Sequence, residues 1–171
     1  MSPAPAPFDS ARYRQVLGHF PTGVTVITAA GAGPGDPGGD TAPAGMAVGS
    51  FSSVSLEPPL VAFFAAHSSS TWPRIEAAGS FCVNILAEDQ EDVCRRFASK
   101  EEDKFAGIGW SPAGSGAPLL QGVLAWIDCD IESVTDAGDH VCVLGRVRDL
   151  GIGHDGAPLV FFRGGYGRFA V

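Results

Sequence analysis

One stretch of this chain carries small and hydroxyl-bearing residues where a packed strand would carry branched apolar ones. The segment GMAVGSFSSVSLEPPLVAFFA, residues 45–65, begins like a β-strand, yet its middle is crowded by Gly49, Ser50, Ser52, Ser53 and Ser55. Strand backbone without bulky side chains permits close approach by a ligand or by another chain. The pattern therefore indicates that something other than core packing uses this backbone.

The familiar signatures of nucleotide, acyl-transfer and zinc chemistry are absent from the sequence. There is no G-x-x-x-x-G-K-[ST] phosphate loop, no G-x-S-x-G elbow and no H-E-x-x-H motif. The glycines of RGGYGRF, residues 163–169, lack the strand-then-helix context of a dinucleotide fingerprint. A nucleotide that binds here is therefore expected to do so without a Rossmann fold.

The cysteines do not form a recognisable metal or redox motif. Cys82, Cys94, Cys129 and Cys142 are widely spaced and include no C-x-x-C pair. A chain of this size builds a core without covalent staples, so we expect free thiols in a reducing cytosol rather than disulfides. No metal site is expected.

Composition limits the class of protein. The 171 residues are 45% hydrophobic and suit one domain, while 23 glycines and 13 prolines indicate many turns between short elements, which favours a β-rich fold. A formal net charge of −8 argues against a phosphate-binding surface for DNA or RNA. Because the N-terminus has no long apolar run, we expect neither a secretory signal nor a membrane span, and predict a cytoplasmic protein.

The elements that would position the glycine- and serine-rich strand are short. We expect residues 1–8 to form a disordered tail and residues 9–171 to form a single domain. Apolar spacing and capping residues predict helices over residues 9–20, 68–79 and 87–99. Turn residues separate predicted strands over residues 23–30, 46–54, 60–65, 81–86, 125–132, 141–150 and 159–169, with a long loop over residues 30–45.

Two of these elements have a clear apolar face. In the first helix the apolar positions fall on one side, at Tyr13, Val16, Leu17 and Phe20. In the strand over residues 125–132, Ile127, Cys129 and Ile131 are predicted to point one way and Asp128, Asp130 and Glu132 the other. Strands joined by hairpins, with a few helices, predict a mainly antiparallel sheet that curls into a barrel.

Six segments, in this order, resemble a known family. They are PTGVTVIT, GMAVGSFSSVSLEPPLV, FCVNIL, FASKEEDKF, the GDH turn and PLVFFRGGYGRF. Together they look like the flavin reductase family, the short-chain NAD(P)H:flavin oxidoreductases that include the reductase components of two-component flavin-dependent monooxygenases. The resemblance covers the chain from Tyr13 to Phe169. It implies a mainly β fold, an antiparallel Greek-key split β-barrel that binds FMN, with a few flanking helices.

The resemblance also implies which strands meet the flavin. A strand backbone would lie along the flavin and its polar edge, at Met46, Ala47, Val48, Gly49, Ser50, Ser52 and Ser53. A second strand would flank the ribityl chain, at Ala62, Phe63 and Phe64. A flat isoalloxazine ring needs a slot lined by backbone N–H groups, which explains why this strand lacks bulky side chains.

A separate group of residues corresponds to the phosphate end of the flavin. Ser68, Ser69 and Thr71 match the hydroxyl-bearing stretch of the family, at a predicted helix N-terminus that suits an anion. Lys104 would supply the countercharge. The alternative interpretation makes these hydroxyls ordinary turn and capping residues.

Two residues are candidates for the nicotinamide side. By resemblance His140 lies near the nicotinamide, where an imidazole would orient the dinucleotide as the catalytic candidate, or it simply completes the hairpin turn. Tyr166 stands where related proteins bring the chain close to the nicotinamide, and otherwise belongs to the core or to a dimer interface. Arg163 and Arg168 would meet dinucleotide phosphates or ordinary carboxylates.

The sequence departs from the family pattern at two positions. Ala47 and Gly49 stand where the family commonly has hydroxyl residues, which removes two possible hydrogen bonds to the flavin. Affinity would then rest on backbone contacts, and the flavin would exchange readily. The loop over residues 30–45 also looks longer than is usual.

The resemblance implies an NAD(P)H:flavin oxidoreductase. It would transfer hydride from NADH or NADPH to FMN or FAD, act as a homodimer, and supply diffusible reduced flavin to a partner monooxygenase. One alternative is a non-catalytic flavin-binding or carrier module. Another is a structural protein whose serine-rich strand is an oligomer interface.

Overall fold

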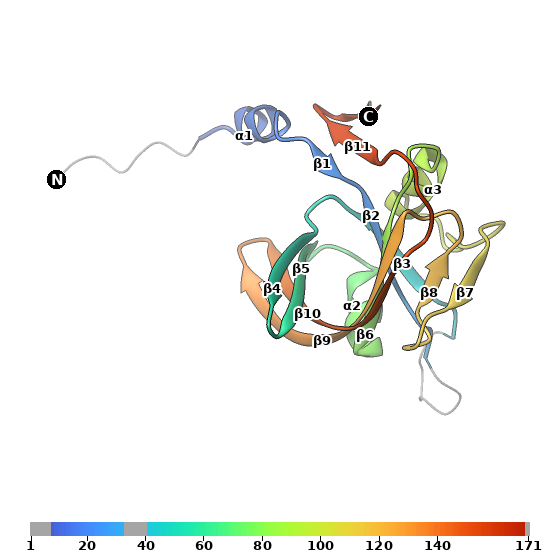
Figure 1. Cartoon of the computed structure of the whole chain (residues 1–171). Helices are drawn as coiled ribbons and strands as arrows, with labels where there is room; N and C mark the ends of the chain where they lie inside the picture. Colours follow the sequence, from blue (N-terminus) through green and yellow to red (C-terminus); the bar gives the residue numbers. More distant parts are fainter. Residues whose placement is uncertain (1–7, 33–40, 170–171) are drawn as a thin grey trace.

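A curled antiparallel sheet forms the body of the computed structural model, which describes residues 8–32 and 41–169 (Figure 1). The predicted tail, except Phe8, and the centre of the predicted loop lie outside these residues. Seven strands run in the order β3-β2-β6-β9-β10-β5-β4. Their bounds are β2 Thr25–Ala29, β3 Ala44–Val48, β4 Ser52–Leu56, β5 Pro59–Ala66, β6 Ser80–Ile85, β9 Ala125–Ala137 and β10 His140–Ile152.

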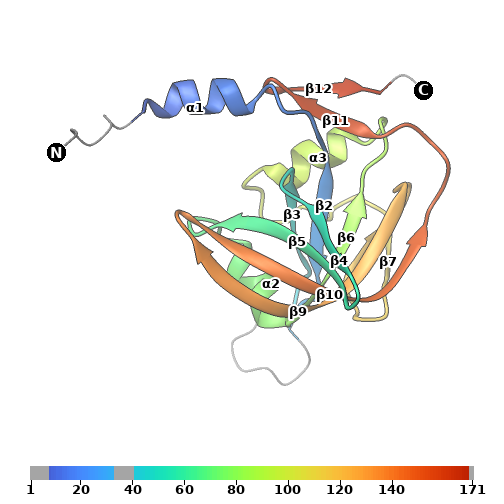
Figure 2. The same cartoon turned by 60° about the vertical axis from the view of Figure 1, so that its left-hand side comes forward.

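The connection between β3 and β4 forces this sheet to curl. The two strands stand at opposite ends of the sheet, yet only residues 49–51 join them. Seven strands laid flat at about 4.8 Å spacing would hold the edges about 29 Å apart, whereas a link of this length spans about 10–14 Å. The edges must therefore come together, and Figures 1 and 2 show the resulting open barrel.

Ser50 anchors this link to β5. Its hydroxyl accepts a hydrogen bond from the Phe64 backbone N–H at 3.0 Å and donates to the Phe64 carbonyl at 3.2 Å. The ladder between β4 and β5 starts at the pair Ser52 and Ala62, so the hydroxyl takes the place of the next strand residue. The prediction of one strand over residues 46–54 was therefore wrong, because the chain crosses from one sheet edge to the other at residues 49–51.

Two smaller sheets flank the barrel. One has the order β1-β11-β12, formed by Thr22–Gly23, Leu159–Phe162 and Gly165–Arg168, and the other pairs β7, Trp110–Pro112, with β8, Pro118–Leu120. The predicted strand over residues 159–169 is thus a hairpin. Its turn uses positive φ angles of 50° at Arg163 and 80° at Gly164, and glycine adopts that conformation readily.

The three helices differ in how they are packed. α2, Trp72–Ala78, and α3, Glu91–Ala98, bury side chains in the core, whereas α1, Ser10–Leu17, buries none. Asp9 caps α1 by accepting a hydrogen bond from the Ala11 N–H at 2.9 Å. The predicted apolar face of α1 is exposed, with Val16 at 60% and Leu17 at 51%. Figure 2 shows α1 projecting away from the barrel beside β11 and β12.

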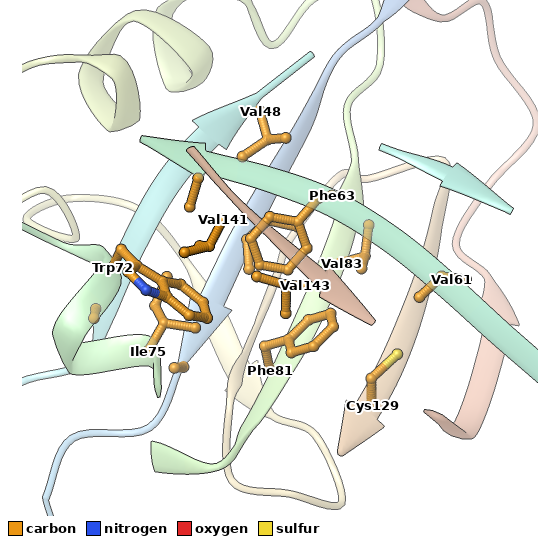
Figure 3. Close-up of a cluster of buried hydrophobic side chains, with 14 residues drawn as sticks. Val48, Val61, Phe63, Trp72, Ile75, Phe81, Val83, Cys129, Val141 and Val143 are labelled. Carbon is orange, nitrogen blue, oxygen red and sulfur yellow. The ribbon is translucent and has the colours of Figure 1, made fainter. Parts of the chain in front are cut away.

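Aromatic side chains fill the inside of the curled sheet. Phe63 makes edge-to-face contacts with Trp72 of α2 and Phe81 of β6, at ring-centroid distances of 6.0 and 5.2 Å (Figure 3). A second cluster, which includes Val26 and Phe97, packs α3 against the outer side of β2. The two clusters hold β3 between α2 and α3, since β3 contacts both helices.

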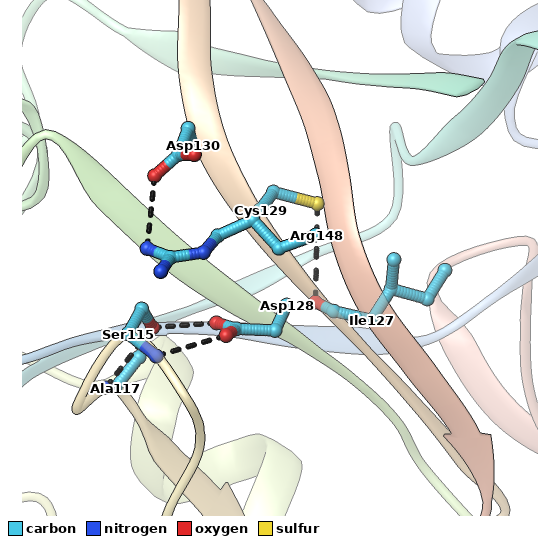
Figure 4. A network of polar contacts seen from close by, with 7 residues as sticks. All are labelled: Ser115, Ala117, Ile127, Asp128, Cys129, Asp130 and Arg148. Atoms are coloured by element: carbon cyan, nitrogen blue, oxygen red, sulfur yellow. Dashed lines mark hydrogen bonds and ion pairs between the residues drawn. The ribbon is translucent and has the colours of Figure 1, made fainter. Parts of the chain in front are cut away.

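One carboxylate of β9 is buried. Asp128, predicted to point to the side opposite Ile127 and Cys129, is fully buried and accepts hydrogen bonds from the Ser115 N–H at 2.9 Å and the Ser115 hydroxyl at 2.5 Å (Figure 4). The loop between β7 and β8 covers this part of the sheet, so the carboxylate meets protein rather than water. Asp130 and Glu132 are exposed as predicted, and Asp130 pairs with Arg148 at 3.1 Å.

The cysteines are free thiols, as predicted. Burial, reinforced by the charge of Asp128, raises the pKa of Cys82 and of Cys129 to about 12. A thiol with such a pKa stays protonated and unreactive at neutral pH. Among residues 8–32 and 41–169, no helix has the length and apolarity to cross a bilayer.

Candidate functional site

A pocket of about 670 Å³ brings together three segments that are far apart in the sequence. We call it the larger pocket. One wall is the strand β3, the second is the hydroxyl-rich loop with the start of α2, and the third is the chain that follows α3. Its lining residues are Pro43, Gly45, Met46, Ala47, Ser68, Ser69, Ser70, Thr71, Arg74, Phe97, Ala98, Ser99, Lys100, Glu101, Glu102, Lys104 and Phe105.

Gly45 lets an aromatic wall pack directly against β3. A Cβ at this position would lie 2.5 Å from the Phe97 ring and 3.2 Å from the Phe105 ring, closer than real contacts allow. Phe97 and Phe105 contact each other edge to face, with centroids 4.9 Å apart. The missing side chain therefore fixes these rings beside the backbone of Met46 and Ala47.

Arg74 and Lys104 both reach the larger pocket and donate hydrogen bonds to backbone carbonyls. The Lys104 Nζ donates to the carbonyls of Phe97 at 3.1 Å and Gly45 at 3.3 Å. The Arg74 guanidinium donates to the Ala42 carbonyl at 2.8 Å. Burial, together with the nearby charge of Arg74, lowers the pKa of Lys104. Two like charges held close together are suited to an anionic ligand, which would relieve their repulsion.

The predicted hydroxyl residues divide into two roles. Ser69 accepts from the N–H groups of Thr71 at 3.2 Å and Trp72 at 3.1 Å, so it caps α2, as the alternative interpretation held. Ser68 and Thr71 line the pocket, as does Ser70, and within the described part of the chain no hydrogen bond engages their hydroxyls. These three hydroxyls are available to a ligand.

The other strand residues predicted to contact the flavin, which we call the predicted strip, face two different environments. Val48 and Ala62 are 6% and 7% exposed and Phe63 is fully buried, so the side chains of Val48 and Phe63 belong to the core and leave only backbone for a ligand. Gly49, Ser50 and Ser52 instead line a second pocket of about 470 Å³, which also includes Phe20–Thr25. Ser53 and Phe64 are exposed and line neither pocket.

An unpaired hydroxyl lies in this second pocket, which we call the smaller pocket. The Thr22 Oγ1 is buried and has no hydrogen-bond partner in residues 8–32 or 41–169. A Cβ at Gly49 would lie 3.2 Å from this oxygen, so glycine leaves a narrow gap beside it. The smaller pocket is lined by Gly49 and Ser50, which come shortly after Met46 and Ala47 in the sequence. The larger and smaller pockets are therefore lined by opposite ends of the predicted strip.

His140 lies outside both pockets. It starts β10, and its Nδ1 lies 2.6 Å from the Asp139 Oδ1, an interaction that lowers the pKa of Asp139. The same hairpin borders the hydroxyl-rich loop, because the Asp139 carbonyl accepts from the His67 N–H at 3.0 Å. The structure thus places His140 near the start of that loop, without bringing it to the strip.

Tyr166 lies on β12 and is likewise separate from the pockets. Its hydroxyl lies 3.3 Å from the Cys94 Sγ, and the Arg95 guanidinium stacks 4.8 Å from its ring centroid. Burial and the contact with Cys94 raise the pKa of Tyr166 to about 12. In this chain Tyr166 therefore packs against α3, which is the core role weighed for it.

Sequence reasoning missed Arg74. It is the third residue of α2 and follows Thr71 by one helical turn, and this spacing was the available signal, because residues three or four apart share a helix face. The sequence contains Arg74 in a predicted helix but offers no clue that this face meets the segment containing Lys104.

The residues and pockets described above correspond to one known family. The model of the flavin reductase like domain matches residues 17–170. This chain belongs to the flavin reductase family. The resemblance is therefore confirmed, as is the split-barrel fold.

Individual relatives agree with the family assignment. A flavin reductase of Pseudomonas putida is 54% identical over 163 residues, covering 95% of this chain and 92% of the relative. The reductase subunit HsaB of a flavin-dependent monooxygenase from Rhodococcus jostii is 49% identical, covering 92% of this chain and 77% of the subunit. The crystal structure of nitrilotriacetate monooxygenase component B from Mycobacterium thermoresistibile superposes with a TM-score of 0.87 at 46% identity, covering 95% and 87% of the two chains.

The residues present fit a flavin nucleotide. The backbone of Met46 and Ala47 lies beside an aromatic wall, as a flat ring requires, and Gly49 leaves space that a side chain would fill. The same pocket contains unengaged hydroxyls and the cations Arg74 and Lys104, which suit a phosphate. The flavin reductase family and the geometry thus agree on the class of ligand.

Proposed function

We propose that this protein is an NAD(P)H:flavin oxidoreductase that supplies reduced flavin to a partner monooxygenase. The observation that carries the proposal is the larger pocket, in which strand backbone bare of bulky side chains leads to two cations, Arg74 and Lys104, and three unengaged hydroxyls. Related chains named as reductase subunits of monooxygenases support the partner class.

The work of the protein in this reaction is binding and orientation. The backbone of residues 46–50 holds the ring edge, while Ser68, Thr71, Arg74 and Lys104 hold the phosphate. Hydride transfer from nicotinamide to flavin is chemistry that the two bound nucleotides supply, so no strong side-chain acid or base is needed. Alignment of the two reactants in one site supplies the rate enhancement.

Exchange of the flavin is part of the proposed function. A reductase that serves a separate oxygenase must release its product, and Ala47 offers no hydroxyl to the ligand. Affinity then rests on backbone contacts and on the phosphate end. We place the protein in the cytoplasm, because its cysteines are free thiols and a reducing compartment keeps thiols unpaired. Cys82, Cys94 and Cys129 are buried.

We also propose that the protein is a homodimer in which α1 packs on a second copy. An isolated helix of eight residues is marginal in water, yet α1 buries none of its side chains in its own chain. Its exposed Tyr13, Val16 and Leu17 adjoin the exposed Phe20 and Phe162. A second copy that covers this surface would provide the missing packing.

Steady-state oxidation of NADH and NADPH, measured with FMN, with FAD and without flavin, tests the oxidoreductase. We expect turnover that saturates with flavin and one preferred nicotinamide. The double variant Arg74→Ala, Lys104→Ala should raise the KM for flavin at least tenfold, and its melting temperature is measured alongside because both side chains also bond backbone carbonyls. Flavin binding without nicotinamide oxidation would instead support the carrier module, and neither binding nor turnover would support the structural alternative.

A further inference from the structure

One histidine outside both pockets faces a carbonyl oxygen with each of its ring nitrogens. The His154 Nδ1 lies 2.9 Å from the Asp155 carbonyl oxygen, and its Nε2 lies 2.9 Å from the Gly122 carbonyl oxygen. A carbonyl oxygen only accepts hydrogen bonds, and a neutral imidazole carries a single N–H. Both contacts are therefore hydrogen bonds only when the ring is protonated on both nitrogens.

We propose that His154 is a pH-sensitive clamp, which joins the chain between β10 and β11 to the turn between β8 and β9 when its imidazole is protonated. We call residues 153–158, which link β10 to β11, the connector. Loss of the proton leaves a nitrogen lone pair facing one of the two carbonyl oxygens. That contact then becomes repulsive, and the connector opens more often.

The connector suits such a device because its middle has little other support. The Gly153 N–H donates to the Leu124 carbonyl at 2.7 Å, and the Ala157 carbonyl accepts from the Glu88 N–H at 2.9 Å. Between these two main-chain bonds, residues 154–156 are exposed. A Cβ at Gly156 would lie 3.0 Å from the His154 Cε1, so glycine lets the connector fold closely around the ring.

The charged groups that face the ring come from two segments. The connector contributes the carboxylate of Asp155, and the chain before α3 contributes that of Asp89. Glu88, next to Asp89, pairs instead with Arg168 at 3.7 Å, and residues 120–125 of the turn after β8 include no charged side chain. The carboxylates that face the ring therefore favour its protonated form.

The carbonyl contacts set the direction of the pH dependence. Hydrogen bonds to the carbonyls of Asp155 and Gly122 are the main cause that raises the pKa of His154 above its ordinary value of 6.5. The clamp is therefore complete below pH 6.5 and is lost as the pH rises through the raised pKa.

The clamp lies at the base of the small sheet that borders the smaller pocket. β11 begins directly after the connector and pairs with β1, whose Thr22 and Gly23 line that pocket. Opening of the connector therefore removes one anchor of the strand behind this pocket wall.

Amide hydrogen exchange at Gly153 and Glu88, followed by NMR at a series of pH values on either side of neutrality, tests the proposal. Exchange is expressed as protection factors, which remove the intrinsic dependence of the rate on pH. We expect protection at both amides to fall about threefold as the pH rises through the titration of His154, because one hydrogen bond of an exposed group is lost. Nitrogen spectra of the His154 ring should show protons on both nitrogens below pH 6.5.

Three variants separate the clamp from other causes of pH dependence. His154→Arg keeps a permanent charge and several N–H donors, so protection should stay high at every pH, whereas His154→Ala should give low protection at every pH. His67→Gln is the matched control, because His67 is another exposed histidine whose ring faces the Asp136 carboxylate at 3.5 Å rather than two carbonyls. It should leave the pH dependence at Gly153 and Glu88 unchanged.

Two results would overturn the proposal. One is the same pH dependence in the unaltered protein and in His154→Arg. The other is a His154 ring that carries a proton on only one nitrogen below pH 6.5. Melting temperatures check that each variant folds, and if His154→Ala does not, the arginine variant and the ring spectra still decide.

Discussion

At the scale of single residues, Lys104 combines a ligand-facing charge with a depressed pKa. Its charged form is disfavoured by burial and by Arg74, so it loses its proton at a lower pH than an exposed lysine. A bound phosphate favours the charged form. Affinity for FMN should therefore be full below the lowered pKa and fall as the pH rises through it.

Titration of FMN affinity against pH checks this prediction. The fall should begin below the ordinary lysine pKa of 10.5, and Lys104→Arg should move it to higher pH because arginine stays protonated. The other charged side chains at this pocket are Arg74, Lys100, Glu101 and Glu102. A flat profile up to pH 10 in the unaltered protein would exclude Lys104 as the phosphate partner.

Ala47 offers a second test at this scale. Replacement by serine places a hydroxyl on the strand wall of the larger pocket, where a new hydrogen bond is worth about 0.5–1.5 kcal/mol. We expect Ala47→Ser to tighten flavin binding about two- to tenfold and to slow its dissociation, as measured by stopped-flow fluorescence. An equal or weaker affinity, in a variant that melts normally, would show that this side chain does not face the flavin.

Residues differ in how far the sequence can predict their roles. Met46, Ala47, Ser68, Thr71 and Lys104 were predicted, through the resemblance, to serve one ligand, and the fold brings them to one pocket. Which of the serines caps a helix depends on backbone geometry that only the folded chain defines. Arg74 was missed because its relevance depends on a contact between segments about thirty residues apart.

At the scale of elements, Ser50 anchors the link between β3 and β4 to the backbone of β5. Ser50→Ala removes both hydrogen bonds to the Phe64 backbone, and each such bond contributes about 0.5–1.5 kcal/mol. We expect a loss of about 1–2 kcal/mol in the free energy of unfolding, measured by urea denaturation. Ser52→Ala is the matched control, because among the described residues the Ser52 hydroxyl bonds only the adjacent Ser53 carbonyl. Equal effects of the two substitutions would refute the anchoring role of Ser50.

Asp128 ties the loop between β7 and β8 to the sheet. Asp128→Asn keeps the shape but removes the charge that strengthens the bonds from the Ser115 N–H and hydroxyl. Hydrogen bonds to charged groups are worth about 1.5–3 kcal/mol, so we expect a loss of about 2 kcal/mol in stability. Hydrogen exchange should localise faster opening to residues 113–117. Unchanged exchange there would mean that other contacts hold the loop.

Features of the helices and strands that depend on contacts between distant segments were not predicted from the sequence. Alternation in β9 predicted the side on which Asp128 lies, but no local pattern reveals that the loop between β7 and β8 buries this carboxylate. The single strand predicted over residues 46–54 is two strands in the structure, β3 and β4. The sequence pattern of apolar and hydroxyl residues continues across both strands and so does not show where one ends. Helices α2 and α3 and most strands were predicted because caps, glycines and periodicity are local signals.

At the scale of the whole molecule, the proposed dimer can be tested by substitutions on the exposed side of α1. Val16→Asp with Leu17→Asp places charges on the surface that we propose is buried between two copies. We expect the protein to sediment as a monomer, with the barrel intact by circular dichroism. Arg12→Ala on the same helix is the control and should leave the dimer unchanged. A monomer in the unaltered protein at micromolar concentration would disprove the dimer.

The short link at residues 49–51 also bears on colloidal behaviour. Edge strands are templates for pairing between chains, and this link keeps the two edges of the sheet, β3 and β4, folded toward each other while β4 still exposes Val54 and Leu56. A proteolytic nick or an insertion between Gly49 and Phe51 would free both edges at once. The cleaved protein should then aggregate into intermolecular β-sheet.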